Sequence, residues 1–119
     1  MFEKIMQEIL EETKVSGEDI VWLKCVVEKA YHTTKRINLC IETARWLAIG
    51  VHLAGAIKRA RNGEILPEID PSIVKQIRPE MQAISGEILS SIQSIGARIA
   101  SLSEIILLAV HLQCAQDGF

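Results

Sequence analysis

The chain has 119 residues, of which 49% are hydrophobic and 24% are charged, a balance that suits one globular domain with its own core. The formal net charge is −2 and no run of five or more like charges occurs, which argues against direct binding to nucleic acid. No uncharged stretch approaches the roughly 20 residues that a membrane-spanning helix needs, and the N-terminus lacks the pattern of a secretory signal. We therefore expect a single cytoplasmic domain over residues 1–119.

Three cysteines, Cys25, Cys40 and Cys114, are an odd number and are spread along apolar stretches. This is typical of reduced, buried thiols in a cytosolic protein and not of a disulfide framework.

The first half of the chain predicts three helices. Apolar residues recur at helical spacing over residues 2–14. Ser16 resembles an N-cap for a second helix that runs to about residues 32–35. A third and longest helix is expected over residues 39–61, because the following Asn62-Gly63 suits a left-handed C-terminal cap.

The second half begins with a proline-containing loop over residues 64–71, in which Asp70 is expected to cap a short helix that starts at Pro71. A further helix is predicted over residues 79–99. It contains Gly86 and Gly96, and close helix packing would explain both glycines.

Ser101-Leu102-Ser103-Glu104 fits a capping box for a last helix that reaches about Cys114 and is apolar on nearly every side, as a central helix would be. No strand-like alternation persists and no repeat emerges. The predicted fold is an all-α, compact helical bundle of about five to six helices.

Histidines are the side chains that titrate near neutral pH, and His52 and His111 stand out among the three in this chain. His52 has the small residues Gly55 and Ala56 one turn onward. Helical side chains lean toward the N-terminus, so Arg59, two turns onward, points back toward His52 and could support a phosphate there.

His111 lies in an apolar run, with Glu104 two turns earlier. A histidine in such a setting is also compatible with a purely structural role in the core. His32 stands beside two threonines near a helix end and is expected to be a solvated surface residue.

The sequence shows few features of a metal site or of an enzyme active site. The sequence has no Cys-x-x-Cys or His-x-x-x-His pair, and His111 with Cys114 makes only half a metal site, so we expect no metal and no cofactor. Catalytic triads, glycine-rich phosphate loops and paired-carboxylate signatures are not recognisable. We do not expect an enzyme.

Two of these motifs together resemble the PTS regulation domain of bacterial transcription regulators. Residues 52–59 match its pattern His-x-x-x-Ala-Ile-x-Arg, with Gly63 soon after, and residues 104–111 match Glu-x-x-x-Leu-Ala-x-His. The similarity covers roughly residues 20–114, so residues 1–15 would form an extra N-terminal helix.

The resemblance implies a cytoplasmic helical module of transcription regulation, whose histidines, here His52 and His111, accept phosphate from the sugar phosphotransferase system. The donor would be its histidine-containing phosphocarrier or an enzyme II component, and Arg59 and Glu104 would support the phosphate. The resemblance also implies a homodimer and a partner transcription regulator, without direct contact to nucleic acid or membrane.

The chain departs from the family in one important position and in length. The family usually has an aspartate before the first histidine, where this chain has Val51. A chain of this length also has no room for the nucleic-acid-binding domain that better-known members carry.

Two alternatives therefore remain open. In the first, a degenerate domain keeps the fold as a scaffold for interaction or dimerisation, without phosphoryl transfer. In the second, a small enzyme or ligand-binding bundle uses His52 with Arg59 to hold an anionic metabolite.

Overall fold

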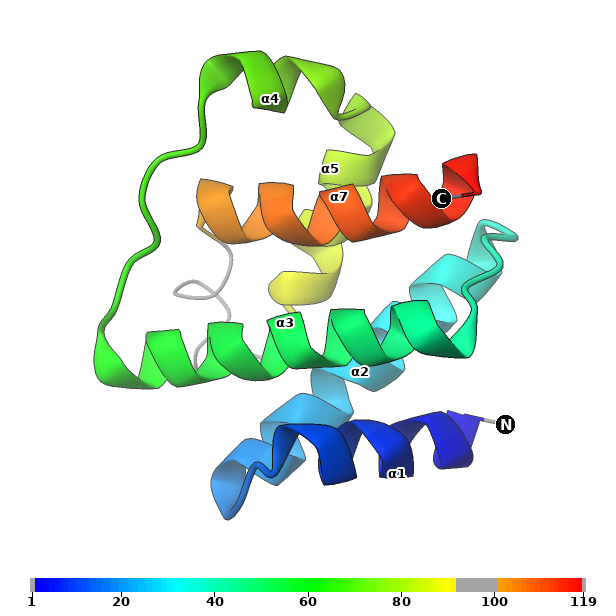
Figure 1. The fold of residues 1–119 in the computed structure, drawn as a ribbon, viewed down its shortest axis with the longest axis vertical. Helices are drawn as coiled ribbons and strands as arrows, with labels where there is room; N and C mark the ends of the chain where they lie inside the picture. The colour runs from blue at the N-terminus through cyan, green and yellow to red at the C-terminus, as the bar shows by residue number, and fades with distance from the viewer. Residues whose placement is uncertain (1, 92–100, 119) are drawn as a thin grey trace.

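The computed structural model describes residues 2–91 and 101–118. Within these residues the chain is helical and contains no strand (Figure 1), which confirms the predicted all-α bundle. The helices are α1 (Phe2–Thr13), α2 (Glu18–Arg36), α3 (Thr43–Asn62), α4 (Pro71–Gln76), α5 (Pro79–Leu89) and α7 (Leu102–Asp117).

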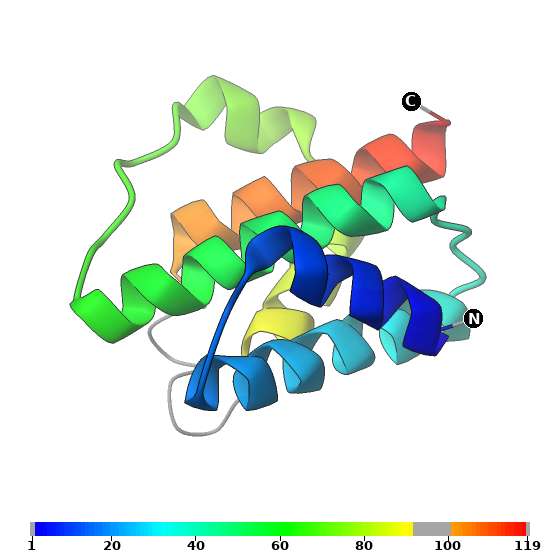
Figure 2. The same cartoon turned by 60° about the horizontal axis from the view of Figure 1, so that its bottom comes forward.

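The helices form two layers with one short helix at the edge. In the first layer α3 lies between α1 and α7, and α3 and α7 run side by side in opposite directions (Figure 1). In the second layer α2 packs against α1 and α3, while α5 packs against α2 and α7, as the turned view in Figure 2 also shows. The arrangement places one face of α3 directly against α7.

The core fills the space between these layers. Its largest fully buried side chains come from α1, α2, α3, α5 and α7, and they are Ile9, Leu23, Ile49, Leu53, Ile57, Met81, Ile88, Leu89, Ile106, Leu108 and Leu112. Helix α7 is apolar on most sides because it contacts both α3 and α5. Within its layer, however, α3 and not α7 has a neighbour on each side, so the last helix is less central than predicted.

Helix α1 is an integral part of the bundle. Ile5, Met6 and Ile9 are buried, and α1 approaches α3 closely at Gly50. A Cβ atom at Gly50 would lie only 2.6 Å from Cγ2 of Ile9. The absence of a side chain at Gly50 therefore sets the distance between α1 and α3.

Two of the predicted caps, at the end of α3 and the start of α4, are confirmed, and the one predicted for α2 is wrong. Gly63 adopts a left-handed conformation with φ of 70° and ends α3, and Asp70 accepts a hydrogen bond from the backbone N–H of Ser72 at the start of α4. Ser16 was expected to cap α2, but that prediction is wrong. The cap is Gly17, which has φ of 61° and provides no side chain for a hydrogen bond.

The predicted helix over residues 79–99 is shorter than expected. Helix α5 ends at Leu89, and the remainder beyond residue 91, including Gly96, lies outside the described residues. Close packing does not explain Gly86, since a Cβ atom there would lie 3.7 Å from Cδ1 of Ile105, which is ordinary contact. Among the glycines that the structure describes, Gly50 and Gly55 are the tightly packed ones.

Gly50 and Gly86 allow the effect of close packing on stability to be compared with the effect of helix propensity. We expect Gly50→Ala to lower the free energy of unfolding by about 1–3 kcal/mol, because the fully buried Ile9 has no room to move aside. The matched control Gly86→Ala should raise it by up to about 1 kcal/mol through helix propensity alone. Urea denaturation of both variants checks this, and equal effects at the two positions would contradict the packing explanation.

The exposure of the cysteines corrects one prediction. The three thiols are free, but Cys25 and Cys40 are exposed and Cys114 is only half-buried, so the expectation of buried thiols is wrong. None of the described helices has the length and apolar character needed to cross a membrane.

Candidate functional site

A row of polar side chains lies between α3 and α7. On α3, Arg45, His52 and Arg59 are seven residues apart, and on α7 Glu104 and His111 have the same spacing. Seven residues make about two helical turns, so each set lies along one face of its helix. Because the two helices are antiparallel, Arg59 meets Glu104 at one end and Arg45 meets His111 at the other, with His52 between them.

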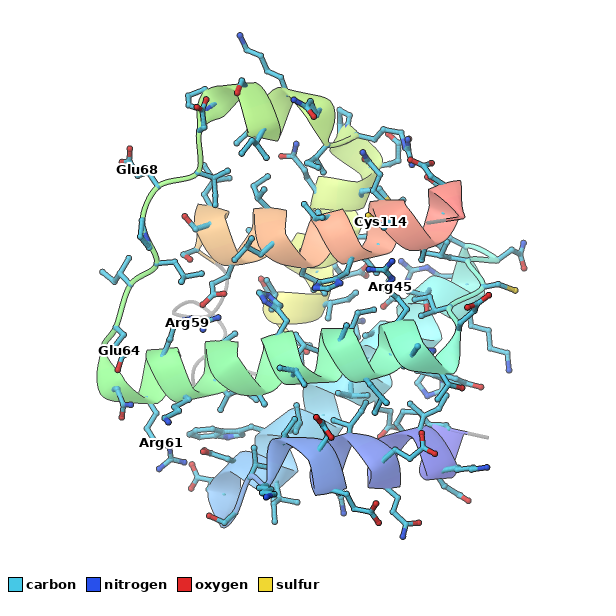
Figure 3. The ribbon with its side chains drawn as sticks, in the orientation of Figure 1. Arg45, Arg59, Arg61, Glu64, Glu68 and Cys114 are labelled. Atoms are coloured by element: carbon cyan, nitrogen blue, oxygen red, sulfur yellow. The ribbon has the colours of Figure 1, made fainter. Side chains whose placement is uncertain are left out.

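Arg59 and Glu104 form a bidentate ion pair. The Arg59 Nε atom donates to Oε2 of Glu104 at 2.8 Å and an Nη atom donates to Oε1 at 2.9 Å. The Glu104 side chain is 5% exposed and that of Arg59 is 24% exposed. Figure 3 shows Arg59 between α3 and α7, toward the start of α7, while Arg45 lies toward the end of α7. A two-point, charge-assisted contact of this kind fixes the orientation of both groups.

The role of Glu104 at the start of α7 is only partly as predicted. Ser101 is the N-cap, and its Oγ accepts a hydrogen bond from the backbone N–H of Glu104 at 3.4 Å, which is half of a capping box. The Glu104 carboxylate turns to Arg59, where it binds a positive charge. Glu104 is thus part of the polar row as well as of the first turn of α7.

His52 is enclosed, and one of its ring nitrogens has no hydrogen-bond partner in the part of the chain that the structure describes. Its side chain is 9% exposed, and its Nε2 atom lies 3.8 Å from Oε1 of Glu104, too far for a hydrogen bond. Burial lowers the pKa of His52 to about 4, with the nearby Glu104 opposing this change and His111 and Arg59 adding to it. The imidazole is therefore neutral at physiological pH.

His111 is held by Arg45. An Nη atom of Arg45 lies 3.3 Å from Nδ1 of His111, and since a guanidinium has only donors, Nδ1 must accept this hydrogen bond. The pKa of His111 is lowered, first by burial and then by the charge of Arg45. The rings of His52 and His111 are 6.1 Å apart between centroids. The structure thus brings together two neutral histidines, each beside an arginine.

The four site residues predicted from the sequence all lie in this row, and they are His52, His111, Arg59 and Glu104. Arg45 was missed. The signal that could have found it is its position seven residues before His52, the same interval that separates His52 from Arg59.

The remaining candidates lie elsewhere. His32 is exposed and lies beside Glu28 and the ring of Tyr31, as expected of a surface residue. Over residues 2–91 and 101–118, no group of three His, Cys, Asp or Glu side chains is placed to hold a metal ion. Val51 is 50% exposed and brings no polar group to the site.

Two surface cavities lie near the row without including its centre. One is lined by Arg45 with Cys40 and Glu42, and the other by Val51 and Gly55 with charged residues of α1, α2 and α3. His52 and Arg59 line neither of them. The His52 side chain is 9% exposed, which leaves little surface for a small anionic metabolite to contact.

The pKa of His52 predicts a dependence of stability on pH. The pKa in the folded state, about 4, lies below the ordinary value of 6.5, so between these values the unfolded chain binds more protons. The free energy of unfolding should therefore fall as pH decreases below 6.5, by about 2 kcal/mol at pH 5. Urea denaturation at pH 7.5 and 5 measures this. The His52→Gln variant should show a clearly smaller loss, and an equal loss would contradict the assignment to His52.

Comparison of the sequence with models of known protein families and with curated proteins finds no match, and neither does comparison with solved structures.

Proposed function

We propose that this chain is a stand-alone, phosphorylation-responsive regulatory domain of the kind found in PTS regulation domains, with His52 and His111 as phosphate acceptors. The observation that carries the proposal is the pair of neutral imidazoles, 6.1 Å apart, with Arg59 and Arg45 beside them. A neutral imidazole nitrogen is a competent nucleophile, and the arginines offer positive charge where negative charge would arrive.

The proposed reaction is transfer of a phosphoryl group from a phosphohistidine of the donor. The lone pair of an unprotonated ring nitrogen forms the new N–P bond as the donor's N–P bond breaks, and the electron pair of that bond returns to the donor's imidazole. For His111 the unprotonated nitrogen is Nδ1, which accepts from Arg45. The reaction needs no metal or cofactor bound to this chain, and it is not a turnover of substrate.

The position of the histidines suggests how phosphate would act as a signal. The His52 side chain is 9% exposed, so a donor reaches it only when α3 and α7 separate at this point. Once attached, the phosphate repels Glu104 and attracts Arg59, and their ion pair is broken. Phosphorylation would thus favour an arrangement of α3 and α7 different from the present one.

The proposed partners follow from this chemistry. The donor is the histidine-containing phosphocarrier or an enzyme II component of the phosphotransferase system, and the responding surface contacts a second copy of this chain or a transcription regulator. In this proposal the domain receives phosphate and passes on its state through such contacts.

The proposal is tested by incubating the purified chain with phosphoenolpyruvate, enzyme I and the phosphocarrier, followed by intact-mass measurement. We expect one or two added phosphates, which are reduced by His52→Ala and by His111→Ala and abolished in the double variant. The matched control His32→Ala, at an exposed histidine, should keep the full added mass. No added mass in the wild-type chain would refute the proposal.

The burial of the site favours one second candidate, the scaffold for interaction or dimerisation without phosphoryl transfer. His52 and Glu104 are almost fully enclosed, and Val51 offers no polar group to orient the ring. A folded chain that takes up no phosphate but forms a stable dimer would support this candidate over the first.

A further inference from the structure

Gly55 lies on α3 directly beneath the Arg59 guanidinium. A Cβ atom at Gly55 would lie 3.1 Å from an Nη atom of Arg59, with two further guanidinium atoms at 3.7 Å. The first of these distances is shorter than an ordinary van der Waals contact. Gly55 therefore provides the space in which the guanidinium lies against the helix.

The position of the guanidinium determines which groups the two carboxylate oxygens of Glu104 bind. Arg59 engages both carboxylate oxygens, at 2.8 and 2.9 Å, and the Nε2 atom of His52 is left 3.8 Å from Oε1. Within residues 2–91 and 101–118, this buried nitrogen has no hydrogen-bond partner. A small shift of the carboxylate, if Arg59 released it, would bring Oε1 within hydrogen-bond distance of Nε2.

We propose that Gly55 is a positioning residue: without a side chain there, Arg59 holds both oxygens of Glu104 and keeps this carboxylate from taking a hydrogen bond from Nε2 of His52. A carboxylate bound to Nε2 would fix the proton on that nitrogen and remove its lone pair. The geometric part of this inference is independent of the proposed function. Only the purpose of the arrangement, which is to keep Nε2 available as an acceptor of phosphate, rests on that function.

The charged groups around His52 make this measurable. Glu104 and His111 of α7 and Arg59 of α3 are the titratable groups that act on its pKa. Displacing Arg59 turns the negative charge of Glu104 toward the ring and removes a positive one. Both changes stabilise the imidazolium, so the pKa of His52 should rise.

The experiment is a pH titration of the His52 ring followed by ¹H–¹⁵N NMR. We expect a midpoint near 4 in the wild-type chain, and a midpoint shifted toward or above the ordinary value of about 6.5 in Gly55→Val. Arg59→Met, which removes the guanidinium without adding bulk at Gly55, should give the same direction of shift. Ala54→Val, one residue earlier on α3, controls for a branched side chain in the helix and should leave the midpoint unchanged.

A loosened fold would also raise the pKa of His52, because it would expose the ring. The Glu104→Gln variant separates this cause from a hydrogen bond to Glu104. If Glu104 takes the hydrogen bond, Gly55→Val in the Glu104→Gln background shifts the midpoint much less. An unchanged midpoint in Gly55→Val, or a rise that persists fully in that background, would overturn the inference. The titration needs no phosphate donor, so its result is independent of whether the chain accepts phosphate.

Discussion

Replacing Arg59 by methionine should lower the free energy of unfolding by about 3 kcal/mol, because it leaves the carboxylate of Glu104 buried beside a mostly neutral His52 ring in place of the guanidinium. The Glu104 side chain is 5% exposed, so water replaces little of what the guanidinium provides. Urea denaturation at pH 7.5 measures the loss.

Two controls separate this effect from a general loss of charge. Arg36→Met removes an equally short but exposed pair with Glu87 and should cost no more than about 1 kcal/mol. In the double variant Arg59→Met/Glu104→Met no buried charge remains, and its stability should return to within about 1 kcal/mol of the wild type. A loss in Arg59→Met as small as that in Arg36→Met would contradict the description of a buried pair.

Phosphorylation of His52 should loosen the start of α7. A phosphoryl group on Nε2 must occupy the space in which Oε1 of Glu104 now lies 3.8 Å away, and its charge competes for Arg59. Glu104 is in the first turn of α7, and the neighbouring Ser103 Oγ donates to the carbonyl of Pro67 at 2.8 Å. Displacing Glu104 therefore weakens both the helix start and its contact with the loop between α3 and α4.

Hydrogen exchange followed by mass spectrometry checks this expectation. We expect the amides in the first turns of α7 to exchange at least about tenfold faster in the phosphorylated chain, which corresponds to a loss of about 1.4 kcal/mol in local stability. The amides of α1, which pack on the opposite side of α3, serve as an internal control. Unchanged exchange in α7, in a chain whose His52 carries phosphate, would show that the ion pair does not transmit the signal.

The sequence predicts the fold well because its strongest signals are local. Helical periodicity or a capping residue locates each described helix, and Gly63 and Asp70 mark helix ends by conformations and hydrogen bonds that involve only a few neighbouring residues. One error is local, the cap at Ser16. Others, such as the burial of the cysteines and the glycine of closest approach, concern packing between distant segments. Gly86 was read as a site of close approach, but the glycine that α1 meets is Gly50, and no local pattern identifies which glycine a distant helix will contact.

The candidate site was predictable to a similar extent. His52, Arg59, Glu104 and His111 were found through their motifs, whereas the contact between Arg45 and His111 depends on the antiparallel alignment of α3 and α7. The same alignment explains why only half of the capping box predicted at Glu104 forms. A capping box is a local pattern, and only the tertiary structure brings Arg59 within reach of the carboxylate.

The most direct test of the proposed acceptor role is ³¹P NMR of the chain after transfer from the phosphocarrier. The proposal predicts phosphohistidine signals of which one is lost in His52→Ala, another in His111→Ala, and both in the double variant, while His32→Ala retains them. A spectrum without phosphohistidine, or a signal that survives in the double variant, would contradict the assignment of these two histidines as phosphate acceptors.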